Sequence, residues 1–498
     1  MTHTVAERQS SRMIKIDPIT RLEGHGTISI FLNEEGDVER AYFQVPELRG
    51  FEEFCKGRQV ESLPSIVTRL CGVCPAAHHL ASAKAGDEVY AVDPPPAAKK
   101  LRELMYMAHY CHSHIAHFYM LAAPDFICGP DASPAERNVL GVIAKVGREI
   151  GEAVIEQRAR AQRAQAILAG RATHMVWALP GGVSKGLSEE DRKTLRAWGE
   201  EMRGFAVYSM KLFRQHVLGN DAYKNMILSD PFSLRIHDMG LVDAHGCVNF
   251  YDGTVRVTDP AGAEVARYHP RDYLKHIAER VEPYSYLKYP YLKAKGWKGF
   301  VEGADSGVYR ATPLSRLNVA SGMATSLAHE AYEEMYHVLG GKPVHATLAT
   351  HWARLVELIY AAERWCELAA DPEITSPDVR TIPESVPTEG VGCVEAPRGT
   401  LIHHYVTDGN GICTSVNLIV GTTNNNAAIS MSIASAARGL ISKGKPVTEG
   451  ILNRIEMAFR AYDPCFSCAT HSILGQMPLE VIVFDSARVP IMTFGRGV

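Results

Sequence analysis

The sequence lacks long apolar runs and long runs of like charge. No apolar stretch among its 498 residues approaches the roughly 20 residues that a membrane-spanning helix needs. Residues 1–12 are polar and lack the apolar segment of a signal peptide, so we expect a cytoplasmic protein without a membrane span. The net charge is −4 and there are no Lys/Arg clusters, which argues against a nucleic-acid binder.

The chain is also poor in motifs for organic cofactors. It has no Gly-x-Gly-x-x-Gly dinucleotide signature, so we expect no flavin or nicotinamide in this chain. Its eleven cysteines are odd in number and irregularly spaced, which favours reduced thiols over a disulfide framework. Apart from two Cys-x-x-Cys pairs, the cysteines form no further cluster motif.

What the sequence does contain is helical periodicity with short strands at intervals. We predict a mainly α chain with small β sheets, an α+β fold built on a large helical bundle. We expect one domain over 1–498, divided into an N-terminal sheet with the first cysteine motif (1–95), a helical bundle (96–230), a β-rich insert (231–312), helices with the second cysteine motif (313–471) and a C-terminal extension (472–498).

Individual elements are predicted from periodicity and capping. One long helix is expected over 134–168, with Ser133 as its N-cap and Pro134 at its first position. Residues 373–395 are rich in Pro, Glu and Gly and are expected to form a loop. Other helices are expected at 96–121, 189–218, 314–339, 344–370, 427–442 and 448–461, and strands at 13–16, 27–31, 41–45, near 234, and at 246–250, 254–257, 400–405 and 479–484.

Two Cys-x-x-Cys pairs stand near opposite ends of the chain. They are Cys71 with Cys74, and Cys465 with Cys468. Four converging thiolates form a soft-ligand cage suited to zinc, nickel, copper(I) or iron–sulfur, with the metal between the N- and C-terminal segments. From spacing alone, a structural zinc and a redox metal are equally good interpretations.

The flanks of both pairs favour the redox metal. The sequence reads Arg69-Leu-Cys-Gly-Val-Cys-Pro-Ala-Ala-His78 at one end and Asp463-Pro-Cys-Phe-Ser-Cys-Ala-Thr-His471 at the other. With four further blocks in the same order, the chain resembles the large, catalytic subunit of nickel–iron hydrogenases, of the cytoplasmic, multimeric, bidirectional type. These blocks are Arg21-Leu-Glu-Gly-His25, Arg49-Gly-Phe-Glu52, His114-Ile-Ala-His-Phe-Tyr119 and Glu395-Ala-Pro-Arg-Gly399.

The resemblance implies the ligands of a nickel–iron centre. Cys71 and Cys465 would be terminal nickel ligands, and Cys74 and Cys468 would bridge nickel to an iron that carries carbon monoxide and cyanide. His78 would hydrogen-bond a bridging sulfur. The implied activity is the reversible oxidation of dihydrogen to protons and electrons.

Two residues are expected to act in catalysis. Glu23 matches the proton-relay carboxylate beside a terminal cysteine, which heterolytic cleavage of dihydrogen requires. Arg398 matches the arginine that overhangs the open position between the metals. Asp463, in the same block as the second cysteine pair, is expected to lie just outside the metal ligands.

The resemblance also implies a second metal and contacts to cyanide. Glu52, the main-chain carbonyl of Leu418, and His471 would hold a magnesium ion, or an iron, beneath the active centre. Thr422 and Thr423 would supply hydroxyl and backbone donors to a cyanide.

Three features depart from the family pattern. Gly421 stands where the family usually has Pro, and Ser113 stands where many members have an Asp near the arginine. Ser472 to Val498 extend past the histidine at which the family commonly ends after maturation. We therefore expect residues 472–498 to be removed by a maturation peptidase once nickel chaperones have delivered the metal.

Electrons are expected to leave through partner chains. The implied partners are an iron–sulfur small subunit of the hydrogenase, together with further subunits of the nicotinamide, deazaflavin, ferredoxin or disulfide-reductase type. The alternatives are a dihydrogen sensor and a nickel-free homologue in an electron-transfer complex. The presence of all four cysteines argues against the nickel-free homologue, and the C-terminal extension argues against the dihydrogen sensor.

Overall fold

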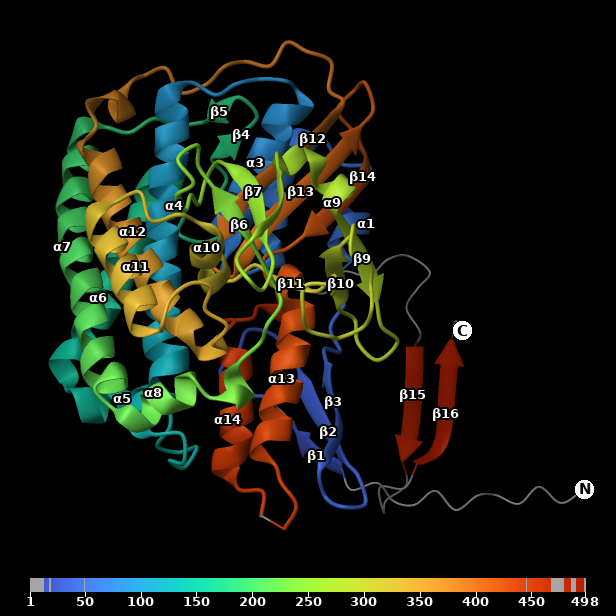
Figure 1. Ribbon diagram of the computed structural model, residues 1–498. Helices are drawn as coiled ribbons and strands as arrows, with labels where there is room; N and C mark the ends of the chain where they lie inside the picture. Colours follow the sequence, from blue (N-terminus) through green and yellow to red (C-terminus); the bar gives the residue numbers. More distant parts are fainter. Residues whose placement is uncertain are drawn as a thin grey trace, which may run out of the picture.

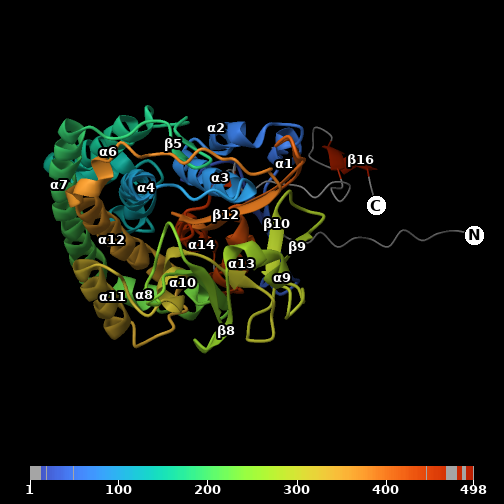
Figure 2. The same ribbon diagram turned by 90° about the horizontal axis from the view of Figure 1, so that it is seen from above.

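A bundle of long helices forms one side of the molecule (Figures 1 and 2). This computed structural model describes residues 13–17, 19–48, 50–444 and 446–466, and the backbone of 479–484 and 490–496. In the bundle, α12 packs against both α4 and α7, and its Trp352 and Trp365 are fully buried. The bundle helices are α4 (Pro96–Ala116), α6 (Arg148–Ala169), α7 (Glu189–Phe213), α11 (Ser326–Val338) and α12 (Thr350–Ala370).

Shorter helices connect the bundle to the sheets. Two π-helical segments, η3 (His117–Ala122) and η4 (Pro124–Cys128), continue α4. The shorter α-helices are α1 (Phe51–Cys55), α2 (Leu63–Ile66), α3 (Pro75–Val89), α5 (Val139–Val146), α8 (Asp221–Ile227), α9 (Tyr273–His276), α10 (Pro313–Val319), α13 (Asn426–Leu440) and α14 (Glu449–Arg460).

Several small sheets lie beside the bundle, and most of their pairings are antiparallel. The sheet β12-β13-β14 consists of β12 (Glu389–Ala396), β13 (Gly399–Thr407) and β14 (Cys413–Ile419). The others are β1 (Met13–Ile16), β2 (Thr27–Leu32) and β3 (Val38–Gln44); β6 (His237–Val242), β7 (Thr254–Thr258), β8 (Glu264–Tyr268) and β11 (Tyr309–Arg310); β9 (Ile277–Val281) and β10 (Lys288–Leu292); β4 (Ala178–Leu179) and β5 (Gly182–Val183); and β15 (Leu479–Phe484) and β16 (Pro490–Arg496).

Helix α3 lies directly on the sheet β12-β13-β14. A Cβ atom on Gly392 would come within 1.9 Å of the carbonyl oxygen of Ala81, and one on Gly390 within 2.3 Å of that of Ala85. The two glycines are two residues apart and therefore face the same side of β12. Their lack of a side chain lets the backbones of the helix and the strand touch, which fixes the middle of α3 against the sheet.

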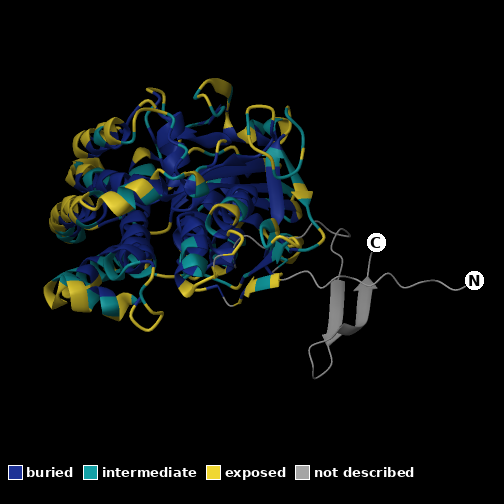
Figure 3. Ribbon diagram, turned by 60° about the horizontal axis from the view of Figure 1, so that its bottom comes forward, coloured by how far each residue is buried: buried dark blue, intermediate teal, exposed yellow. Residues whose placement is uncertain are grey.

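Two segments, one near each end of the described chain, meet beneath the sheet β12-β13-β14. Glu23 and Cys465 form an isolated parallel bridge, and the N–H of Phe466 donates to the Glu23 carbonyl at 3.0 Å. Buried residues fill the space between bundle and sheets, and exposed ones form the rim (Figure 3). The predicted mainly α architecture with small sheets is confirmed.

Some predicted elements are wrong. The helix expected over 134–168 is two helices, because Asn138 caps α5 by accepting from two backbone N–H groups and Gly147, at φ 98°, separates α5 from α6. The helix expected over 314–339 is likewise divided into α10 and α11, and β12 begins inside the expected loop 373–395. No strand forms at 234 or at 246–250 in the described chain. Strand β6 was not predicted, because all six of its residues are buried and it therefore lacks the alternation of buried and exposed positions.

Candidate metal centre

Three of the four predicted ligand cysteines converge in the core. One ligand atom from each of Cys71, Cys74 and Cys465 lies within 4.8 Å of the others, and all three residues are buried. The sulfurs of Cys71 and Cys465 are 3.2 Å apart although the residues are 394 positions apart in the sequence. Cys468 and His471 lie outside the described residues, so their predicted roles stay predictions.

The first cysteine pair lies at the start of α3. Cys74 is the N-cap of that helix and Pro75 occupies its first turn. The sulfur of Cys71 accepts hydrogen bonds from the backbone N–H groups of Val73 at 3.2 Å and Cys74 at 3.1 Å. Two backbone N–H groups therefore point at the sulfur that is predicted to bind nickel.

Glu23 lies where the predicted proton relay requires a carboxylate. Its Oε2 is 2.9 Å from the sulfur of Cys465. The segment is anchored by Arg21, at φ 57°, whose guanidinium donates to Asp125 at 2.5 Å and to the carbonyl of Leu121 at 2.9 Å. A carboxylate in hydrogen-bond contact with a ligand thiol can exchange a proton with it.

Arg398 faces the same small cavity as the cysteines. The cavity is lined by Cys74, His78, Ala396, Arg398, Leu401, Val420, Gly421, Thr422 and Cys465. Nη2 of Arg398 donates to Oδ1 of Asp463 at 3.2 Å and lies 3.1 Å from its Oδ2, while Nε and Nη1 of Arg398 have no hydrogen-bond partner among the described residues. Burial alone would lower the pKa of Arg398, but Asp463 and the cysteines raise it above its ordinary value, so the guanidinium stays charged.

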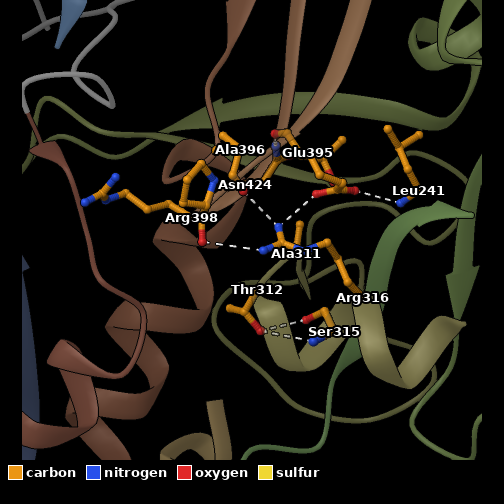
Figure 4. Close-up of polar contacts among 12 residues, drawn as sticks. Leu241, Ala311, Thr312, Ser315, Arg316, Glu395, Ala396, Arg398 and Asn424 are labelled. Carbon is orange, nitrogen blue, oxygen red and sulfur yellow. Dashed lines mark hydrogen bonds and ion pairs between the residues drawn. The ribbon is translucent and has the colours of Figure 1, made fainter. Parts of the chain in front are cut away.

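The turn that carries Arg398 is held by a buried ion cluster (Figure 4). Arg316 on α10 pairs with Glu357 through two hydrogen bonds of 2.6 and 2.8 Å and with Glu395 at 2.9 Å. The same guanidinium donates to the carbonyl of Ala396 at 2.9 Å. Sequence reasoning missed Arg316 and Glu357, because only the fold brings them to this turn.

His78 belongs to a line of buried polar side chains. Its Nδ1 lies 3.1 Å from Nε2 of His403, whose Nδ1 lies 2.7 Å from the Tyr405 hydroxyl. Tyr405 in turn donates to Ser82 at 2.9 Å. The remaining nitrogen of His78, Nε2, is buried and has no partner within the described chain, as expected of a group that faces an additional ligand.

The predicted threonines, Thr422 and Thr423, and Ser113 are also buried in the core. Thr422 lines the cavity, and its hydroxyl accepts from the backbone N–H of Cys465 at 3.0 Å. The hydroxyl of Thr423 is buried without a partner in the described part of the chain. Ser113 is also buried, and it leaves Asp463 as the carboxylate that pairs with Arg398.

Glu52 and Leu418 are in contact through the Leu418 backbone N–H, whereas the second-metal prediction uses the Leu418 carbonyl. The Leu418 N–H donates to Oε1 of Glu52 at 2.9 Å, and the ammonium of Lys288 donates to the same oxygen at 2.8 Å. Lys288 also pairs with Glu279 at 3.2 Å and lies 3.4 Å from the side-chain oxygen of Asn417. This cluster of carboxylate and amide oxygens is the donor type that magnesium prefers.

Comparisons with known proteins agree on one family. The family model described as nickel-dependent hydrogenase matches residues 49–145 and 236–471, and a model described as HoxL-like matches residues 13–48. An iron-sulfur subunit of the F420-non-reducing hydrogenase of Archaeoglobus profundus is 48% identical over 482 residues, which cover 97% of this chain and 99% of the relative.

Similarity extends to a second relative and to a solved structure. The NAD-reducing hydrogenase HoxS subunit beta of Cupriavidus necator is 38% identical, with coverage of 96% of this chain and 98% of the relative. The crystal structure of an NAD+-reducing [NiFe]-hydrogenase in the H2-reduced state superposes with a TM-score of 0.87 at 39% identity, covering 93% of this chain and all of that one. No helix among the described residues has both the length and the apolarity to cross a membrane.

Proposed function

Because the chain belongs to the nickel-dependent hydrogenase family, we propose a role for each residue of its metal centre in the oxidation of dihydrogen. The chain is the catalytic large subunit of a hydrogenase and works with partner subunits. The observation that carries the residue assignments is that Cys74, Cys465 and Arg398 line one small cavity while Cys71 and Glu23 both contact the sulfur of Cys465.

Cys71 and Cys465 are the proposed terminal nickel ligands, and Cys74 and Cys468 the proposed bridges to iron. The soft thiolate donors fit nickel and iron. When bound, the centre supplies the site where dihydrogen is split and its electrons are collected. The unpartnered nitrogens of Arg398 fit cyanide on the iron, and Thr422 and Thr423 would contribute further donors.

Glu23 is the proposed acceptor of the proton that dihydrogen cleavage releases beside Cys465. The 2.9 Å contact allows direct transfer between sulfur and carboxylate. Arg398 holds positive charge over the cavity, and Asp463 orients its guanidinium. His78 is proposed to direct Nε2 to the bridging sulfur of Cys74.

Glu52, the main chain of Leu418, and His471 are proposed to hold a magnesium ion. The ammonium of Lys288 and the carboxylate of Glu279 would adjoin that ion. We also propose that the mature chain ends at His471, after a peptidase has removed residues 472–498. Within this extension β15 pairs with β16, so the extension forms a hairpin of its own. The intact mass of the active enzyme tests the cleavage.

The proposed electron acceptor is a nicotinamide, reached through an iron–sulfur small subunit that passes electrons to a nicotinamide-reducing module. The relative from Cupriavidus necator is named as NAD-reducing, and the one from Archaeoglobus profundus as F420-non-reducing, which favours nicotinamide over a deazaflavin. To test this proposal, the purified complex would be supplied with dihydrogen and either NAD+ or F420. Reduction of NAD+ alone is expected, and reduction of F420 alone would contradict the proposal.

A further inference from the structure

The turn between β12 and β13 presents Arg398 to the cavity, and the carbonyls of Ala396, Pro397 and Arg398 each accept a hydrogen bond from a side chain. Ala396 pairs with Gly399 across the turn, so Pro397 and Arg398 form its two central residues. A two-residue turn has few internal hydrogen bonds, so its orientation depends on groups outside it. A Cβ atom placed on Gly399 (φ 152°) would lie 2.4 Å from the Gly421 carbonyl oxygen, so the turn packs against the segment that follows β14.

Arg316 holds the first half of the turn. Its Nη1 donates to the carbonyl of Ala396 at 2.9 Å and its Nη2 to that of Pro397 at 3.4 Å. Both carboxylates that pair with Arg316 are fully buried, so the guanidinium cannot leave without exposing two unpaired charges to the core. Arg316 is therefore a rigid donor to the residues immediately before Arg398.

Asn425 holds the second half. Its side-chain amide donates to the carbonyl of Arg398 at 2.8 Å and to that of Gly421 at 3.1 Å. Its oxygen accepts from the N–H of Ala311 at 2.7 Å, which fixes the amide in one orientation. The guanidinium of Arg398 extends from this turn away from Arg316 (Figure 4).

We propose that Arg316 and Asn425 are positioning residues that set where the Arg398 guanidinium lies over the metal cavity. Neither lines the cavity or contacts a cysteine of the centre in the described chain. They act by fixing the backbone on both sides of Arg398, so that its side chain needs no reorganisation during turnover. The inference rests on the proposed function, since it assumes that Arg398 acts at the metal centre.

Two conservative substitutions test the proposal. Arg316→Lys keeps the charge between Glu357 and Glu395 but loses the planar fork that reaches the turn. Asn425→Asp keeps the shape and the acceptor for Ala311 but removes the donor to the Arg398 carbonyl. The matched control is Arg310→Lys, because Arg310 is equally buried and pairs with Asp238 and the Val344 carbonyl, and no hydrogen bond within the described chain joins its side chain to the turn.

The measurements are kcat for dihydrogen oxidation by the complete complex, nickel and iron content, and crystal structures of the variants. We expect Arg316→Lys and Asn425→Asp to lower kcat by about tenfold to a hundredfold with metal content unchanged, since a misplacement of about 1 Å has this effect. Their crystal structures should show a displaced Arg398 guanidinium. Arg310→Lys should keep kcat within about threefold of wild type.

Failure of this inference differs from failure of the proposed function. A wild-type complex that does not oxidise dihydrogen would contradict the proposed function. An unmoved Arg398 in Asn425→Asp, or equal kcat losses in Arg316→Lys and Arg310→Lys, would overturn the positioning role. If Arg316→Lys does not assemble, Asn425→Asp and its crystal structure decide the question alone.

Discussion

At the scale of single residues, most of the side chains proposed to act at the metal centre lie within short sequence motifs. Cys71, Cys74, Glu23, Arg398 and Asp463 could be predicted because each lies in a short block with a distinctive context. Arg316, Lys288 and His403 could not be predicted. Their roles depend on buried partners that are far away in the sequence, and nothing local distinguishes them from surface charges or core histidines.

Replacing Glu23 by Gln is expected to remove proton transfer while keeping the metals. Gln matches the shape of Glu but cannot carry the proton, and loss of a general acid–base group costs about 100-fold to 10,000-fold in rate. The measurement is dihydrogen–deuterium exchange together with nickel content. Glu34→Gln, on an exposed turn, is the control and should exchange at the wild-type rate. Wild-type exchange by a nickel-replete Glu23→Gln enzyme would show that Glu23 is not the relay.

Replacing Arg398 by Lys is expected to lower turnover by about a hundredfold. Arg398 pairs with Asp463 through one nitrogen and leaves two others for the cavity. Lysine keeps the positive charge but lacks this planar fork of nitrogens. Steady-state dihydrogen oxidation by the assembled complex measures the loss. Activity within about threefold of wild type would leave Arg398 with a structural role only.

At the scale of elements, the contact of α3 with β12 positions the first cysteine pair. The strand itself was missed within a Pro- and Glu-rich segment, because its pairing with β13 rather than its own composition makes it a strand. Likewise, the break at Gly147 and the cap at Asn138 are local features that one long helical pattern concealed. Helix periodicity alone therefore predicts where helices are more reliably than where they end.

Replacing Gly392 by Ala is expected to destabilise the large subunit by about 1–3 kcal/mol or more and to reduce metal occupancy. The new methyl group would lie 1.9 Å from the Ala81 carbonyl oxygen, so α3 and the cysteine at its N-terminus must shift. Thermal unfolding and nickel content are the measurements. Gly204→Ala is the control, because the added Cβ on α7 would meet no described atom within 4 Å apart from the backbone of its own helix and its chain neighbours. Equal stability and equal nickel content in the two variants would contradict the account.

At the scale of the whole molecule, the core contains many buried histidines that are held neutral. Burial lowers the pKa of His79, His109 and His114 to about 4 and of His112 and His351 to about 3. In the unfolded chain these rings bind protons below a pH of about 6.5. At these histidines the unfolded state therefore binds more protons than the folded state as the pH falls from about 6.5 towards 4, so they lower the free energy of unfolding over that range.

The expected acid sensitivity is up to about 1.4 kcal/mol per pH unit for each such histidine. The midpoint of denaturant unfolding, measured between pH 7 and pH 5, should fall steadily. His351→Gln should make that decline shallower than it is in the wild type. A midpoint that rises on acidification would contradict the sign of this prediction.

The central claim is that this chain holds one nickel–iron centre on thiolates from both ends of the sequence. Elemental analysis and infrared spectroscopy of the purified complex test it most directly. The account predicts one nickel per large subunit together with carbon monoxide and cyanide bands, both lost in Cys71→Ser and both retained in Cys366→Ser, whose buried cysteine lies on α12. Zinc in place of nickel, or a nickel-containing wild type without those bands, would contradict it.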